Sequence, residues 1–196
     1  RMRKDEQMMD EVVKDSMFEL DNLSAYLVKV REMTRADDEQ TPLSVRLFNL
    51  SETLEKLLRL TVIPADKHVR FETRLTPNPL WVTADSVHLT NSISNLVENA
   101  IKYSGNEVCI RISASLAEGK LVIRVADNGF GISSQDQLHI FDKFYRSEQM
   151  VGRGLPGIGL GLSYVKLMVE AHGGTVGVES ILGKGSVFTL EIPQSK

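Results

Sequence analysis

Apolar and small side chains recur at alternating spacings of four and three residues from Met9 to Val30. This 3.5-residue period is typical of the seam of a coiled coil or helical bundle, so we predict one long helix over residues 5–34. A single amphipathic helix is only marginally stable in water, and its seam therefore needs a partner. The seam consists of Met9, Val13, Ser16, Leu20, Leu23, Leu27 and Val30.

The pattern changes to a mixed rhythm of helices and strands after a polar stretch at residues 35–42. We therefore divide the chain into a first unit at residues 1–35, a linker at 36–45 and a second domain at 46–196. The second domain has predicted strands at about 69–75, 80–83, 108–116, 121–126, 175–180 and 186–192, and a glycine-rich loop at 150–161.

Capping residues mark the predicted helices of the second domain. Asn49, followed by an acidic residue three positions later, caps a helix that ends near Leu60. Asp85 caps a helix that ends near Tyr103. A third helix follows the glycine-rich loop and ends at His172, before two glycines that suit a C-terminal cap.

The composition excludes some classes of function. With 23 Lys and Arg against 26 Asp and Glu, the formal charge of −3 provides no basic field for nucleic acid. No apolar run is long enough to span a membrane, and the first residues show no signal-peptide pattern. The single cysteine, Cys109, lies in an alternating stretch and is expected to be a strand or core residue. We expect a soluble, cytoplasmic fragment whose membrane attachment, if any, lies in segments outside it.

Polar side chains share one face of the helix that begins after Asp85. Asn95, Asn99 and Lys102 lie on this face, and Glu98 flanks it. Asparagine oxygens can ligate a hard cation such as Mg²⁺, and a lysine can neutralise phosphate. A solvated helix face is the competing interpretation. The opposite side, which would pack on a sheet, carries Leu89, Ile93, Leu96, Val97 and Ala100.

Two further segments carry groups that could bind a ligand. Asp127 follows a strand, where a fixed carboxylate can accept a hydrogen bond from an exocyclic amine such as that of adenine, although an ordinary Asp-Asn-Gly turn has the same sequence. The glycines at 152–161 lead into a helix N-terminus, whose free N–H groups can hold phosphates. This loop is neither a Rossmann fingerprint, because Leu162 replaces the last glycine, nor a Walker A loop.

The order of these segments resembles that of histidine kinases. Residues 95–103 resemble the N box, 127–132 the G1 box, 141–146 (Phe-Asp-Lys-Phe-Tyr-Arg) the F box and 152–162 the G2 box. The ending at residues 183–193 is also similar. Over about residues 45–193 the chain therefore resembles the ATP-binding catalytic domain of two-component sensor histidine kinases.

The resemblance implies an α+β fold of the Bergerat type, found in the GHKL ATPase superfamily, in which helices cover one face of a mixed sheet in a two-layer sandwich. It also implies ATP and Mg²⁺ as ligands. Asn99, with Asn95 beside it, would bind the metal. The residues implied at the nucleotide are Asn95, Asn99, Lys102, Tyr103, Asp127, Gly129, Gly131, Ile132, Arg146, Gly157, Gly159, Gly161 and Leu162.

The resemblance also implies a lid at about residues 143–156, anchored by Phe141 and Phe144. Lys143 and Glu98 are the candidate catalytic residues. In related ATPases a glutamate of the asparagine helix activates water, whereas the acceptor in histidine kinases is a histidine. The role of Glu98 therefore stays open.

The implied activity is transfer of the ATP γ-phosphoryl group to a histidine at the start of the first dimerisation helix, for relay to a response regulator. None of the four histidines has this position, and His88 is expected to be a solvated residue of the asparagine helix. Residues 1–35 are therefore expected to be the second dimerisation helix of a homodimer, and the fragment should not phosphorylate itself. The alternatives are a serine kinase of the anti-sigma-factor type and a non-catalytic nucleotide-binding module.

Overall fold

The computed structural model describes residues 42–152, 155 and 157–194. The helix predicted at residues 5–34, and with it the proposed dimerisation unit, lies outside the described residues. The part from Pro42 onward forms one compact unit. No helix of the described part is both long and apolar enough to cross a membrane.

Five strands form the main sheet of this unit, in the order β2-β4-β5-β7-β6. β2 runs parallel to β4, and the other neighbours are antiparallel, so the sheet is mixed. The strands are β2 His68–Thr76, β4 Glu107–Ala117, β5 Lys120–Asp127, β6 Thr175–Ile181 and β7 Gly185–Pro193.

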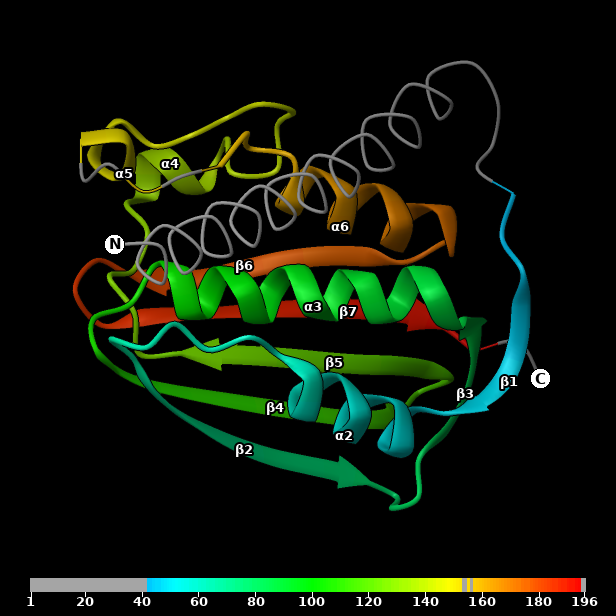
Figure 1. Cartoon of the computed structure of the whole chain (residues 1–196). Helices are drawn as coiled ribbons and strands as arrows, with labels where there is room; N and C mark the ends of the chain where they lie inside the picture. The colour runs from blue at the N-terminus through cyan, green and yellow to red at the C-terminus, as the bar shows by residue number, and fades with distance from the viewer. Residues whose placement is uncertain (1–41, 153–154, 156, 195–196) are drawn as a thin grey trace, which may run out of the picture. The chain divides into compact units, whose positions relative to one another are not determined.

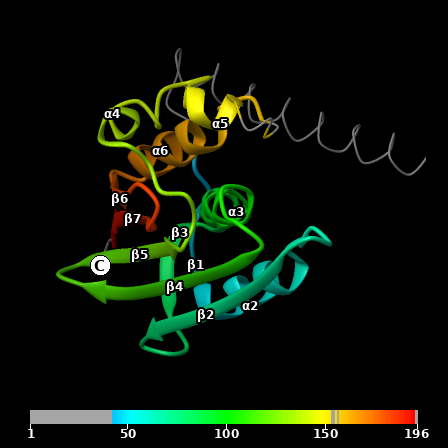
Figure 2. The ribbon, with the colours of Figure 1, turned by 90° about the vertical axis from the view of Figure 1, so that its left-hand side faces the viewer.

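The longer helices α2, α3 and α6 lie on one face of this sheet (Figures 1 and 2). This arrangement confirms the predicted α+β fold with helices on one face of a mixed sheet. The helices are α2 Leu50–Leu60, α3 Ser86–Lys102, α4 Ser134–Gln137, α5 Glu148–Gly152 and α6 Gly161–Ala171.

Helix α3 is placed by its cap and its apolar side. Oδ1 of Asp85 accepts hydrogen bonds from the backbone N–H groups of Val87 and His88, each at 3.0 Å. The predicted apolar side is buried in the core, and each large side chain of this kind contributes about 1.5–3 kcal/mol when fully buried. The polar residues at the end of α3 lie on the other side of the helix from this apolar set. The buried set is Leu89, Ile93, Leu96, Val97 and Ala100.

The hairpin of β4 and β5 delivers Asp127 to the end of a central strand. Its turn residues Glu118 and Gly119 have φ angles of 51° and 74°, which is the left-handed conformation of a tight two-residue hairpin. The hairpin predicted around these two residues is therefore confirmed.

Two regions differ from the prediction. Residues Val45–Asn49 form strand β1, which pairs antiparallel with β3, Trp81–Asp85, in a separate two-stranded sheet. We predicted no strand before Asn49, because five residues that run directly into a helix cap show no local strand pattern. The glycine-rich loop was also predicted too long, because residues 150–152 belong to α5.

The prediction that His88 is solvated is wrong. Its side chain is only partly exposed, and its Nδ1 lies 2.9 Å from the hydroxyl of the buried Tyr164 in α6. The helical wheel places His88 on the polar side of α3 but does not show that α6 covers the first turns of that side. The contact therefore joins the two helices.

Candidate functional site

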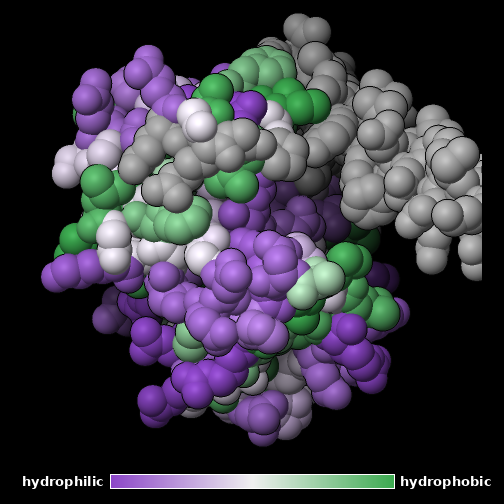
Figure 3. All heavy atoms as spheres, turned by 60° about the vertical axis from the view of Figure 1, so that its left-hand side comes forward, coloured by the Kyte–Doolittle hydropathy of each residue, from purple (hydrophilic) through white to green (hydrophobic). Residues whose placement is uncertain are grey.

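A pocket lies between the C-terminal end of α3, the end of β5 and the segment that carries α4 and α5. Its empty volume is about 770 Å³ with the open mouth included, which suits a small-molecule ligand. Figure 3 turns this end of the domain toward the viewer and shows hydrophilic side chains over the centre, with apolar patches nearer the edges. The predicted residues that line the pocket are Asn99, Tyr103, Asp127, Gly131, Ile132, Arg146 and Leu162.

Asp127 lines this pocket at the end of β5. Its Oδ1 accepts hydrogen bonds from the backbone N–H groups of Gly129 at 2.8 Å and Ser186 at 3.2 Å. Burial raises the pKa of the carboxyl, and the two hydrogen bonds act in the opposite direction. Since both bonds end on Oδ1, Oδ2 is the oxygen that is left, within the described part of the chain, for a ligand. Such an acceptor can receive an exocyclic amine.

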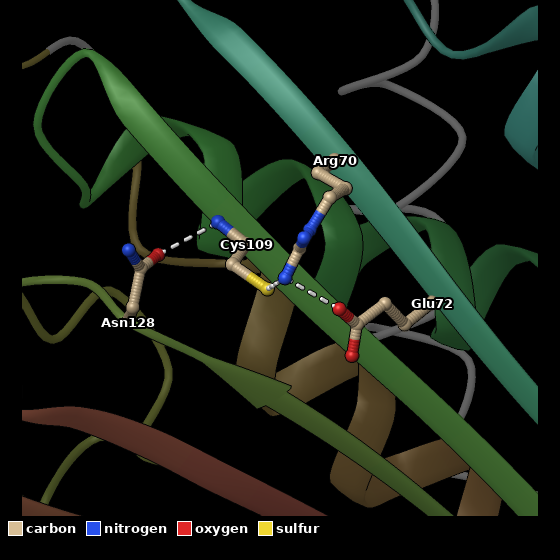
Figure 4. A network of polar contacts seen from close by, with 4 residues as sticks. All are labelled: Arg70, Glu72, Cys109 and Asn128. Carbon is tan, nitrogen blue, oxygen red and sulfur yellow. Dashed lines mark hydrogen bonds and ion pairs between the residues drawn. The ribbon is translucent and has the colours of Figure 1, made fainter.

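The side chain of Asn128 ties the loop after β5 to strand β4 (Figure 4). Its Oδ1 accepts a hydrogen bond from the backbone N–H of Cys109 at 2.8 Å, and its Nδ2 donates to the carbonyl of Glu107 at 3.1 Å. Both partners belong to β4, so this side chain extends the pairing of β5 with β4. Cys109 is a strand residue, as predicted, and Arg70 donates to its sulfur at 3.8 Å.

Gly131 and Ile132 form the next part of the pocket wall. Gly131 has a φ of 69°, and a Cβ there would overlap the carbonyl oxygen of Ile181, so only glycine fits. The N–H of Ile132 donates to Oγ of Ser180 at 2.8 Å. Nε2 of Gln137 donates to the carbonyls of Ile132 and Ser180, at 2.8 and 3.0 Å. The wall is therefore clamped to β6 by hydrogen bonds.

The end of α3 brings a cation close to the pocket. The Nζ of Lys102 lies 5.0 Å from the ring centroid of Tyr103. Burial and then the positive charge of Arg146 lower the pKa of Lys102, while Glu98 acts in the opposite direction. Lys102 and Arg146 therefore repel each other, and an anion between them would relieve this repulsion.

The glycine loop lies against these groups. A Cβ at Gly157 would meet the ammonium group of Lys102, so the loop backbone and this cation are neighbours. At Gly159, with a φ of 77°, a Cβ would be 2.6 Å from the carbonyl oxygen of Tyr145. The N-cap residue of α6, Leu160, makes no side-chain capping hydrogen bond. The side chain of the N-cap residue therefore accepts no hydrogen bond from the backbone N–H groups at the start of α6. Anion-binding helix N-termini use such N–H groups to hold the anion.

Eight predicted site residues do not line the pocket. Lys102 and the glycines at 129, 157, 159 and 161 are five of them, and the other three are Asn95, Glu98 and Lys143. Asn95 is 4% exposed, and its Oδ1 would be 3.2 Å from a Cβ at Gly161, so it packs beneath the start of α6. Glu98 is exposed and accepts a hydrogen bond from Oγ of Ser94 at 2.8 Å. Lys143 is exposed as well.

Sequence reasoning missed a group of polar lining residues, namely Asp136, Tyr145 and Ser147. Asp136 stands three residues after Ser133, the spacing of a helix cap, and its N–H does donate to Oγ of Ser133 at 3.0 Å. The capping pattern was therefore a usable signal. Among the described residues, no group of three or more His, Cys, Asp or Glu could hold a metal. A hard cation here would depend on Asn99 and on oxygens of the ligand itself.

Comparison with known families decides the assignment. The model described as histidine kinase-, DNA gyrase B-, and HSP90-like ATPase matches residues 84–196. This chain belongs to that family. Among its relatives is the sensor histidine kinase WalK of Bacillus subtilis (strain 168), 40% identical over 130 residues, which cover 65% of this chain and 21% of WalK. The chain spans between 21% and 38% of the length of three curated sensor proteins that it matches.

Solved structures place this ATPase-family chain with the catalytic domains of histidine kinases. Full-length ShkA in complex with AMPPNP has a TM-score of 0.76 and 25% identity, over 90% of this chain and 36% of ShkA. ThkA in complex with the response regulator TrrA has a TM-score of 0.67 and 25% identity, over 90% of this chain and 49% of ThkA. The resemblance to sensor histidine kinases is therefore confirmed.

Proposed function

We propose that this chain binds ATP with Mg²⁺ and transfers the γ-phosphoryl group to a histidine of a dimerisation region, for relay to a response regulator. One arrangement carries this proposal. The pocket has a fixed carboxylate, Asp127, on its sheet side. Two cations that repel each other, Lys102 and Arg146, lie on the side of the glycine loop. A molecule with an amine at one end and several negative charges at the other complements this pocket.

On the sheet side, Oδ2 of Asp127 would accept a hydrogen bond from the exocyclic amine of adenine. The walls nearby include Ile132, Ile140 and Phe188, which offer apolar surface to a purine ring. Selectivity follows from the acceptor, because a guanine carbonyl at the same place would face a carboxylate without a proton between them.

On the loop side, Lys102 and Arg146 would neutralise phosphate oxygens, and the start of α6 would add its N–H groups. Asn99 lines the pocket and would provide an amide oxygen to Mg²⁺. A Mg²⁺ ion bound there would supply further charge neutralisation at the phosphates. Asn95 packs beneath the start of α6 and would hold that helix end in place at the phosphates.

The acceptor histidine must come from elsewhere. Among the described histidines, His172 is engaged through both ring nitrogens: Nδ1 lies 2.6 Å from the carbonyl of Met168, and Nε2 accepts from the N–H of Asp85 at 2.9 Å. His88 contacts Tyr164. His68 and His139 are exposed and do not line the pocket. We therefore place the acceptor on a dimerisation helix outside this chain, in a homodimeric kinase whose catalytic part lies in the cytoplasm.

The partner at the next step is a receiver domain, as proposed from the ThkA–TrrA neighbour, which is a kinase bound to its response regulator. The test is a transfer assay. The chain is incubated with γ-labelled ATP and Mg²⁺, alone and with a polypeptide that carries the dimerisation helices of a related kinase. We expect acid-labile label on the added polypeptide only.

The Asp127→Asn variant is the control for this assay, because it keeps the pocket shape and loses the proposed adenine acceptor. Label on the chain itself would contradict the proposed site of the acceptor. Label that is acid-stable would favour a serine kinase. ATP binding without any transfer to a cognate acceptor would favour a non-catalytic module.

A further inference from the structure

We propose that Asp136 is a positioning residue that holds the first part of the lid segment, residues 143–152, against the pocket wall so that Arg146 faces the phosphates. The contacts of Asp136 stand by themselves, while its effect on nucleotide affinity rests on the proposed function. Asp136 belongs to the short helix α4 and lines the pocket.

The carboxylate of Asp136 accepts hydrogen bonds from three hydroxyl groups. Its Oδ1 accepts from the hydroxyl of Tyr145 at 2.8 Å. Its Oδ2 accepts from Oγ of Ser133 at 2.7 Å and from Oγ of Ser147 at 3.0 Å. Tyr145 and Ser147 are the two chain neighbours of Arg146. One carboxylate therefore fixes the residues on both sides of the cation that lines the pocket.

The carboxylate does not itself accept the capping hydrogen bond of α4. The cap is made by Oγ of Ser133, which accepts from the backbone N–H of Asp136 at 3.0 Å, and this bond does not involve the Asp136 side chain. The side chain instead points its acceptor oxygens at the lid. Its hydrogen bonds to Ser133, Tyr145 and Ser147 lower the pKa of Asp136 against the effect of burial, so the ionised form is favoured. Hydrogen bonds to an ionised acceptor are roughly twice as strong as neutral ones.

Further contacts pin the same segment. The N–H of Phe144 donates to the carbonyl of Gly159 at 3.0 Å and so holds the start of the lid against the glycine loop. The guanidinium of Arg146 donates to the carbonyl of Leu155. With both neighbours of Arg146 also held by Asp136, the segment is ordered before nucleotide arrives. Because the segment is already ordered, less conformational entropy is lost when the nucleotide binds, and the affinity is higher.

The experiment compares Asp136→Ala, the pair Tyr145→Phe with Ser147→Ala, and the combination of all three. Asp142→Asn is the matched control, because Asp142 directly precedes this segment but is exposed and pairs with His139 at 3.0 Å. Calorimetry measures the affinity for ATP with Mg²⁺ and for adenosine. Hydrogen exchange of residues 143–152 is measured without nucleotide.

We expect Asp136→Ala to lower ATP affinity about tenfold and adenosine affinity less than about threefold, because Arg146 acts only on phosphates. Exchange at residues 143–152 should rise while the sheet stays protected. The triple variant should be within about twofold of Asp136→Ala, because the substitutions remove the same interaction. Asp142→Asn should match the wild type within about twofold.

Three results would overturn the inference. The first is unchanged exchange and ATP affinity in Asp136→Ala. The second is an equal loss of ATP and adenosine affinity, which would make Asp136 a support of the whole pocket. The third is additive effects in the triple variant. If Asp136→Ala does not fold, the Tyr145 and Ser147 variants, which keep the carboxylate and the cap, decide the matter. A wild type that binds no ATP would refute the proposed function, while the exchange data would still test the contact.

Discussion

The sheet side and the loop side of the pocket differ in what holds them in place. On the sheet side, Asp127 receives two backbone N–H groups and Ile132 is bonded to Ser180, so the fold itself sets the geometry. On the loop side, Lys102 and Arg146 repel each other. Hydrogen bonds within the fold therefore hold the sheet side, whereas the loop side, although Asp136 positions the neighbours of Arg146, keeps a repulsion that the phosphates of the proposed ligand would relieve.

The largest expected effect is that of Asp127→Asn. The amide still accepts the N–H groups of Gly129 and Ser186 but turns a donor toward the adenine amine. We expect ATP affinity to fall about a hundredfold, measured by calorimetry. Because burial raises the pKa of this carboxyl, the charged form costs stability above its pKa. The melting temperature at pH 7 should therefore stay the same or rise, and a clear drop would show that the carboxylate is needed for folding.

The second effect concerns the metal. Asn99→Ala removes the amide oxygen proposed for Mg²⁺, so we expect the magnesium-dependent part of ATP affinity to vanish, a loss of about tenfold or more. Titrations with Mg²⁺ and with a chelator should give the same affinity in this variant. If the two titrations still differed as in the wild type, the ligand assignment would be wrong.

The third effect tests the repulsion on the loop side. Lys102→Met removes one cation, so we expect about a tenfold loss of ATP affinity and a smaller loss for AMP. The free energy of unfolding should not fall, because the pKa of Lys102 is lowered in the fold and its charged form is disfavoured there. Urea titration measures this. A marked loss of stability would mean that Lys102 has a structural partner that outweighs the repulsion.

A smaller effect is expected from pH. The pKa of Asp127 is raised in the fold, so protonation removes the proposed acceptor at a pH above the ordinary aspartate value. Adenosine affinity should therefore decrease on acidification, and the decrease should be absent in Asp127→Asn. Calorimetry with adenosine avoids the titration of phosphates. A flat profile in the wild type would remove Asp127 from the adenine contact.

The smallest effect is that of Lys143→Ala. Lys143 is exposed and does not line the pocket, so we expect ATP affinity within about twofold of the wild type. Transfer rates in the assay with an added acceptor check for a catalytic role. A large loss of rate with intact binding would restore Lys143 as a catalytic residue.

Local signals predicted much of the fold. Asn49 and Asp85 cap their helices as expected, with the N–H of Glu52 at 3.3 Å from Oδ1 of Asn49. The turn at Glu118 also formed as predicted. Each of these features depends on a few consecutive residues. Strand β1 was missed because it exists only through pairing with β3, and that partner lies on the far side of α2 and β2 in the sequence.

The site was predictable to a similar extent. The resemblance identified Asp127, Asn99 and Arg146, and all three line the pocket. A helical wheel placed Asn95 on the same face of α3 as Asn99, but a wheel does not show the position along the helix axis. Asn95 lies one turn before Asn99, where the start of α6 covers this face. Asp136 was missed because the capping pattern at Ser133 signals only a helix start, whereas the contacts of its carboxylate with Tyr145 and Ser147 depend on how the lid folds back.

The most direct measurement compares ATP with GTP by calorimetry, both with Mg²⁺, on the wild-type chain. Two nucleotides with the same phosphates differ only at the base, so the comparison isolates the carboxylate of Asp127. We expect ATP to bind and GTP to bind with an affinity lower by about a hundredfold. Equal affinity for the two nucleotides, or no heat with ATP, would contradict it.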